Sequence, residues 1–185
     1  MLEDLLSGNR EFGVVLIERG SEVGGGEVRS GIGTMAKILE ARESGDGHWA
    51  VVAMGLQRIM VERWLPDDPY PMAEVRPFPD RPGPGVDPAS YGALSDRLHC
   101  LLDGLAALGE TVPSDRAEIA EDPALGSLQM AALAPLTPFD RQRILEVDRV
   151  EDRCRLLGEL LGEGQELVDL RRRAGEGGAA PGPPR

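Results

Sequence analysis

The stretch EFGVVLIERGSEVGGGEVRSGIGTMAKILEARE, residues 11–43, decides how the first half of this 185-residue chain folds. It opens with a short, β-branched run at 12–17, a pattern typical of a strand buried on both faces of a sheet. It closes with a longer, mixed strand at 34–42. The glycines between them tolerate positive φ, so we expect 20–33 to be a mobile connection between the two strands.

A strand followed by glycines also opens many nucleotide-binding sites. A phosphate loop needs GxxxxGK[ST], because the lysine reaches the β- and γ-phosphates and the hydroxyl holds magnesium. Lys37 is the only lysine of the chain, and it follows Ala36. The dinucleotide motif GxGxxG also fails, since Gly31-Ile32-Gly33 lacks the third glycine and leads into a strand. We therefore expect no nucleotide and no other cofactor.

The pattern continues as an antiparallel meander. A short helix at 2–6, ended by Gly8, precedes the first strand, and Ser44-Gly45-Asp46-Gly47 is a hairpin turn. Two further strands are expected at 48–54 and 57–65, separated by a bend at Gly55-Leu56. In the second of them, Ile59, Val61 and Arg63 alternate with Met60, Glu62 and Trp64. A fifth strand, at 72–78, is expected at an edge of the sheet because prolines flank it.

The composition changes at 77–88, where prolines and glycines cannot continue a sheet. We assign 1–80 to a β subdomain, 81–88 to a linker, 89–173 to a helical bundle and 174–185 to a disordered tail. Four helices are indicated. At the start of each helix, a capping side chain comes just before a helical pattern. These starts are Asp87-Pro88, Asp122-Pro123, Thr137-Pro138 and Asp148 with Glu151. The apolar stripe of the last helix contains Val150, Cys154, Leu157, Leu161, Gly164 and Val168.

The net charge of −12 limits the partners that this chain can bind. The C-terminal stretch 171–185 holds four arginines and one glutamate, so residues 1–170 are more acidic than the whole. Such a surface repels phosphate backbones and anionic lipid, which argues against nucleic acid and membranes as partners. Two cysteines, no leader and no apolar run of about 20 residues indicate a cytoplasmic, reduced protein.

No catalytic site is expected. His48 and His99 are the only histidines, and no GxSxG motif accompanies them, so a serine nucleophile would have no base. His99 and Cys100 point away from the apolar stripe of their helix, whereas Cys154 lies on its own stripe and is expected in the core. These four residues have no metal-ligand spacing, so no metal is expected either.

Aromatic residues are scarce, yet Trp64, Tyr70 and Phe78 lie around one proline-rich turn and the strand that follows it. In one interpretation they fill the seam between the sheet and the bundle. In the other they form an apolar patch that binds the side chains of a polypeptide partner, since Trp and Tyr are favoured as anchors at interfaces.

The order of these pieces resembles the amino-terminal substrate-binding domain of Lon proteases, and most of all its stand-alone members. The resemblance covers roughly residues 1–172 and rests on five segments in order and spacing: 12–14, 33–38, 55–59, 70–75 and 136–146. It implies an α+β fold, with a pseudouridine-synthase-and-archaeosine-transglycosylase-like (PUA-like) antiparallel β-barrel followed by helices. It also implies a non-enzymatic module that binds unfolded or damaged polypeptides in protein quality control, with a protease or chaperone as a further partner.

One departure concerns the front of the chain. Members of that family have further strands before the short helix that matches 1–6, so we expect either a start farther upstream or a partner strand that fills the gap. Proteolysis is not implied, because the Gly-Lys pair of the ATPase is missing and Lys37 stands alone. Two alternatives stay open: RNA binding by a PUA-like barrel, which the acidic charge disfavours, and a small-molecule hydrolase.

Overall fold

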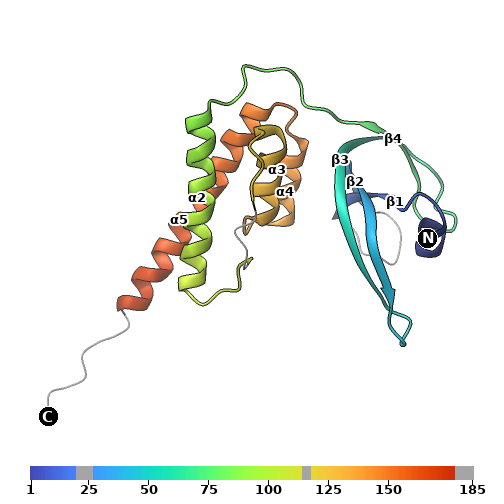
Figure 1. The fold of residues 1–185 in the computed structure, drawn as a ribbon, viewed down its shortest axis with the longest axis horizontal. Helices are drawn as coiled ribbons and strands as arrows, with labels where there is room; N and C mark the ends of the chain where they lie inside the picture. The colour runs from blue at the N-terminus through green and yellow to red at the C-terminus, as the bar shows by residue number, and fades with distance from the viewer. Residues whose placement is uncertain (20–26, 114–117, 178–185) are drawn as a thin grey trace, which may run out of the picture. The chain divides into compact units, whose positions relative to one another are not determined.

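The structure is a computed structural model that describes residues 1–19, 27–113 and 118–177. The chain divides into two compact units, Met1–Pro79 and Asp80–Arg185. The first, which we call the sheet unit, carries the strands (Figure 1). The second, the helical unit, carries the four longer helices (Figure 1).

The sheet unit is an antiparallel meander that follows a short helix, α1 (Leu2–Ser7). Its strands are β1 (Glu11–Arg19), β2 (Val28–Glu43), β3 (Trp49–Trp64) and β4 (Ala73–Pro77), and they lie in the order β1-β2-β3-β4. The meander, the opening helix and the edge position of the last strand are therefore confirmed. Among the described strands, β1 and β4 are the two edges, and no pairing between them closes the sheet into a barrel.

Two expectations about the first strands are wrong. The first strand is not buried on both faces, since Val14 and Ile17 are 49% and 39% exposed. It is also an edge strand, with β2 as its one described neighbour. The glycine-rich stretch is also shorter than expected, because β2 begins at Val28 and contains Gly31 and Gly33. Of the connection expected at 20–33, residues 20–27 precede β2, and 20–26 of these lie outside the described residues.

The strands expected at 48–54 and 57–65 are a single strand, β3. Gly55 does not bend the chain out of the sheet, because it pairs with Ala36 of β2 at a register shift. A side chain at this position would come within 3.2 Å of Thr34 Cγ2, so glycine allows the two strands to stay close. The hairpin turn before β3 is confirmed: Gly47 has φ of 83°, and Ser44 donates its N–H to the carbonyl of His48 at 2.8 Å.

The helical unit contains α2 (Pro88–Ala107), α3 (Pro123–Leu133), α4 (Pro138–Glu146) and α5 (Val150–Gly177). Three expected caps are confirmed, since the side chains of Asp87, Asp122 and Thr137 accept hydrogen bonds from backbone N–H groups of the first helical turn. Asp148, the fourth expected cap, lies two residues before α5 and forms an ion pair with Arg81 at 2.8 Å. The first four residues of the expected tail, 174–177, are helical.

Helices α2 and α5 run in parallel, and their apolar stripes form the core of the helical unit. Leu94 lies opposite Gly158, Leu101 opposite Gly164, and Gly104 opposite Val168. The innermost core side chains are Leu98, Leu101, Met130, Ile144, Leu157, Leu161 and Val168. Cys154 belongs to this core, as its position on the stripe predicted.

The core also contains one charged side chain, Arg153, which is 0% exposed. Its guanidinium makes a bidentate pair with the carboxylate of Asp80, at 2.6 and 3.1 Å. Its remaining N–H groups donate to Ser127 Oγ at 2.8 Å and to the carbonyls of Val147 and Ala124 at 3.2 and 3.0 Å. All five donors are therefore satisfied, and Asp80, the first residue of the unit, is fixed to the helices.

The two cysteines are expected to react at very different rates. Cys100 is exposed, whereas burial raises the pKa of the Cys154 thiol, and the thiolate is the reactive form. At about pH 8 we expect an aromatic disulfide reagent to modify one thiol rapidly and the second only after unfolding in guanidinium. Cys100→Ser should remove the fast phase and Cys154→Ser should leave it. Two fast thiols in the native protein would contradict this placement.

Within the described part of the chain, no helix is long and apolar enough to span a bilayer.

Candidate functional site

An open apolar groove of about 610 Å³ lies on one face of the sheet unit, and we call it the sheet groove. All four strands contribute to its lining. The apolar residues that line it are Phe12, Val14, Val15 and Ile17 of β1, Met35 of β2, Ile59, Val61 and Trp64 of β3, and Ala73 and Val75 of β4. By strand register, the side chains of Val15 and Ile17 lie on the face of Ile59, whereas those of Phe12 and Val14 point to the other face. Its volume is in the range of ordinary ligand sites, and its lining is mainly aliphatic and aromatic.

The floor of the groove is closed and its rim is open. Ile59, on the inner strand β3, is 2% exposed, while Ile17 and Trp64 at the rim keep 39% and 36% of their surface exposed. The exposed apolar rim follows from the edge position of β1, whose outward side has no described neighbour to cover it. Contiguous exposed apolar surface of this kind is typical of a binding site for an apolar or amphipathic partner.

A β-bulge brings Trp64 into the groove. The register of β3 against β4 shifts between Val61 and Arg63, so one residue is inserted without a partner. The inserted residue reverses the alternation of faces, and Trp64 consequently lies on the same side as Ile59 and Val61. The expected alternation, which put Trp64 on the opposite face, is therefore wrong beyond this bulge.

The indole of Trp64 is held by Arg29. The guanidinium carbon lies 4.8 Å from the ring centroid, a cation–π contact. Arg29 in turn forms ion pairs with Asp67 at 2.9 Å and with Glu27 at 3.1 Å. Arg29 donates hydrogen bonds to Asp67 and to Glu27, and the bond to Asp67 is the main cause that raises the pKa of Arg29. The same bond lowers the pKa of Asp67. The groove thus presents a tryptophan whose orientation is fixed before any ligand binds.

Tyr70 and Phe78, the other two expected binding residues, do not line the groove. Both are half-buried. The carboxylate of Asp4, in α1, lies beside the Tyr70 hydroxyl and raises the pKa of Tyr70. Phe78 lies under the guanidinium of Arg58, 4.7 Å from its ring centroid, and Arg58 is on the opposite face of β3 from its neighbour Ile59. The structure therefore disperses the three aromatic residues and keeps Trp64 alone in the groove.

Sequence reasoning missed the residues of β1 that build the groove, because a continuous apolar run does not distinguish a buried strand from an edge strand that faces a groove. It also missed Arg29, because Asp67, one of its two carboxylate partners, is 38 residues away in the sequence. An arginine two residues after a glutamate was the one local signal available.

The charged groups at the groove do not favour an anionic ligand. Glu11, Glu27 and Arg29 line it, and Arg29 is already engaged by two carboxylates. Among the described residues of the lining, a phosphate would therefore meet no cation that lacks a carboxylate partner. In residues 1–19, 27–113 and 118–177, no three side chains of His, Cys, Asp or Glu are grouped so that they could hold a metal ion.

The comparison with protein families identifies this architecture. Residues 1–163 match the family described as the ATP-dependent protease La (LON) substrate-binding domain, so the chain belongs to that family. The match is to the substrate-binding domain and not to the ATPase or peptidase domains of these proteases.

Individual relatives agree with this assignment. The Lon protease of Anaeromyxobacter dehalogenans is 25% identical over 175 residues, and Lon protease 2 of Herpetosiphon aurantiacus is 28% identical over 144 residues. These alignments cover 92% and 75% of this chain but 20% and 17% of the relatives. The chain therefore spans about a fifth of the length of the curated relatives that it matches.

Solved structures show the same fold. A Lon N-terminal domain protein from Xanthomonas campestris superposes with a TM-score of 0.57 at 24% identity, covering 87% of this chain and 80% of that one. The N-terminal domain of the Mycobacterium avium complex Lon protease superposes with a TM-score of 0.58 at 20% identity, covering 81% of this chain and 77% of that one. The α+β fold is thus that of Lon N-terminal domains.

Proposed function

We propose that this chain is a non-enzymatic module that binds unfolded or damaged polypeptides through the sheet groove. The observation that carries the proposal is an open apolar groove, with an oriented tryptophan, in a member of the LON substrate-binding domain family. Unfolded chains expose the aliphatic and aromatic side chains that such a groove would shield from water.

The proposal also includes what happens to the polypeptide after it binds. Because the relatives are Lon proteases, we propose that the polypeptide is passed to a protease, or is held for a chaperone, in protein quality control. Trp64 is proposed as the main aromatic anchor, with Ile17 and Val75 as aliphatic side chains of the same groove. Tyr70 and Phe78 have no part in this proposal, because their contacts lie outside the groove.

The proposal is tested by Val75→Asp. Val75 lines the groove on the edge strand β4, opposite Val61, and is 37% exposed, so a carboxylate there is compatible with folding, but it would be buried without a partner when an apolar segment binds. We expect the affinity for a fluorescently labelled, permanently unfolded carboxymethylated protein to fall by about tenfold or more, measured by fluorescence anisotropy.

The matched control is Val52→Asp, which makes the same change at a valine that is 56% exposed on β3 and does not line the groove. Its affinity should stay within about twofold of the wild type. In a Trp49→Phe background Trp64 is the only tryptophan, so its emission should shift when the unfolded chain binds. Equal losses in both aspartate variants, or no binding by the wild type, would exclude the sheet groove as the site.

A further inference from the structure

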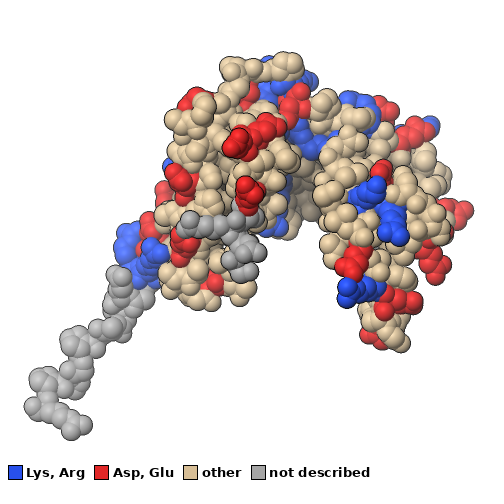
Figure 2. Space-filling view, in the orientation of Figure 1, with Lys and Arg blue, Asp and Glu red and all other residues tan. Residues whose placement is uncertain are grey.

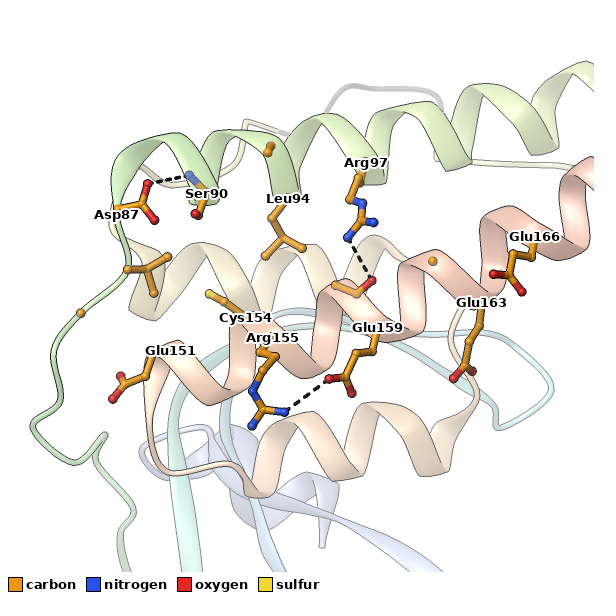
Figure 3. A pocket seen from close by; sticks show the side chains of 15 residues that line it. Asp87, Ser90, Leu94, Arg97, Glu151, Cys154, Arg155, Glu159, Glu163 and Glu166 are labelled. Carbon is orange, nitrogen blue, oxygen red and sulfur yellow. Dashed lines mark hydrogen bonds and ion pairs between the residues drawn. The ribbon is translucent and has the colours of Figure 1, made fainter.

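A second groove, of about 840 Å³, lies along the helical unit between α2 and α5, and we call it the helical groove. Its floor is made of small and apolar side chains, among them Ala93 and Leu94 of α2 and Cys154, Gly158 and Gly162 of α5. Figure 3 shows the two helices bordering it, with Leu94 and Cys154 between them. None of the residues of the sheet unit contributes to its lining.

The rim of the helical groove is acidic. Two arginines, Arg97 and Arg155, face five carboxylates, which are Asp87, Glu151, Glu159, Glu163 and Glu166. Figure 2 shows acidic side chains spread over the visible face of the helical unit, with one group of basic side chains toward the end of α5 and others at the opposite end of the unit. The helical groove therefore has a net negative charge at neutral pH.

The arginines do not neutralise the carboxylates farthest along α5. Arg155 is paired with Asp152 at 2.9 Å and with Glu159 at 3.3 Å, and Arg97 donates to the carbonyl of Gly158 at 3.5 Å. Among the described residues, Glu163 and Glu166 form no ion pair. Both line the groove, and Figure 3 shows Glu159 and Glu163 on the same side of α5.

The floor contains a glycine that packing within the helical unit does not require. A Cβ at Gly162 would have nothing within 4 Å, whereas one at Gly164 would lie 3.1 Å from Leu101. Glycine inside a helix costs about 1 kcal/mol relative to alanine. A bare backbone at the floor of a groove allows another backbone to approach closely, which gives a reason for glycine at this position.

We propose that the helical groove docks a cationic, amphipathic polypeptide segment of a partner protein, with a small apolar side chain over Gly162 and its Lys or Arg side chains on Glu163 and Glu166. The lining of α5 runs from Glu151 to Glu166, which at 1.5 Å per residue is about 22 Å. That length accommodates about four turns of helix, so a peptide segment fits it where a single ion would leave the floor uncovered. This site goes beyond the proposed function, since it uses other residues and another ligand chemistry.

The probe is a 15-residue helical peptide made of Leu, Ala and Lys with the lysines on one flank, and its counterpart with Glu in place of Lys. We expect the wild-type chain to bind the lysine peptide and not the glutamate peptide, and binding should weaken as ionic strength rises. Glu163→Gln with Glu166→Gln should lower the affinity about fivefold, measured by calorimetry. The control, Glu118→Gln with Glu121→Gln, removes the same charge from exposed positions outside the groove and should change the affinity less than twofold.

Gly162→Leu separates docking from folding. The side chain enters open space and leucine favours the helix, so this variant should unfold at a higher denaturant concentration while its affinity for the lysine peptide falls about tenfold or more. Binding of the lysine peptide that neither Gly162→Leu nor the paired glutamine variant affects would overturn the proposal, as would no binding by the wild type. Val75→Asp should bind the lysine peptide normally, so failure of the sheet groove and failure of the helical groove give different results.

Discussion

Replacing Asp80 with alanine is expected to destabilise the helical unit by about 3–5 kcal/mol. The carboxylate of Asp80 is the one described counter-charge within hydrogen-bond distance of Arg153, whose side chain is fully buried. Without that carboxylate, the guanidinium of Arg153 keeps its neutral hydrogen-bond partners in the core. No opposite charge then compensates for its burial. The change in urea unfolding is followed by the circular dichroism at 222 nm, since α2–α5 provide nearly all helical residues.

The control is Arg155→Ala, on the same helix. Arg155 also pairs with two carboxylates, Asp152 and Glu159, but all three side chains are largely exposed. Its removal should therefore cost less than about 1 kcal/mol. Similar losses for Asp80→Ala and Arg155→Ala would mean that the buried pair is not a principal support of the helical unit.

The second large effect is expected in the sheet unit, where Gly33→Ala should cost about 3 kcal/mol. A Cβ at Gly33 would lie 2.4 Å from the carbonyl oxygen of Val14 and 2.7 Å from Val15 Cγ1. The first of these atoms belongs to the backbone of β1, so the two strands would have to separate. Both tryptophans are in the sheet unit, so their fluorescence during urea unfolding reports its stability separately from that of the helices.

Gly31→Ala is the matched control, because the same strand has open space at this position and no atom would come within 4 Å of the new Cβ. We expect no loss, or a stabilisation of up to about 1 kcal/mol from the stiffer unfolded chain. Two equal losses would indicate that glycine is needed throughout the start of β2, and not for the close approach at Gly33 alone.

The helical unit could be predicted from the sequence because its signals are local. Asp87, Asp122 and Thr137 each precede a proline and each caps the helix expected there. Arg153 was not predicted to be buried, although it lies four residues before Leu157 and eight before Leu161, in phase with the buried stripe. Periodicity identified the position, but the charge suggested solvent, and the compensating Asp80 is 73 residues away in the sequence.

The sheet was predicted less accurately, because its decisive features depend on pairing between distant segments. The edge position of β1 follows from which strands pair, not from the run Phe12 to Ile17 itself. The continuity of β3 through Gly55 depends on its partner Ala36. The family resemblance supplied the fold class and the substrate-binding domain, and the family match confirms both, but it gave no basis for separating Trp64 from Tyr70 and Phe78.

The bulge between Val61 and Arg63 has a consequence for how relatives of this chain are compared. On a strand without a bulge, the identity of each residue determines what a given face presents. Here the spacing between Val61 and Trp64 has the same importance, since a relative one residue shorter in this segment would turn its tryptophan to the other side of the sheet with an otherwise unchanged sequence. The number of residues between Val61 and Trp64 therefore determines on which face of the sheet the tryptophan lies. A sequence alignment that ignores a one-residue gap in this segment would assign the tryptophan of a relative to the wrong face.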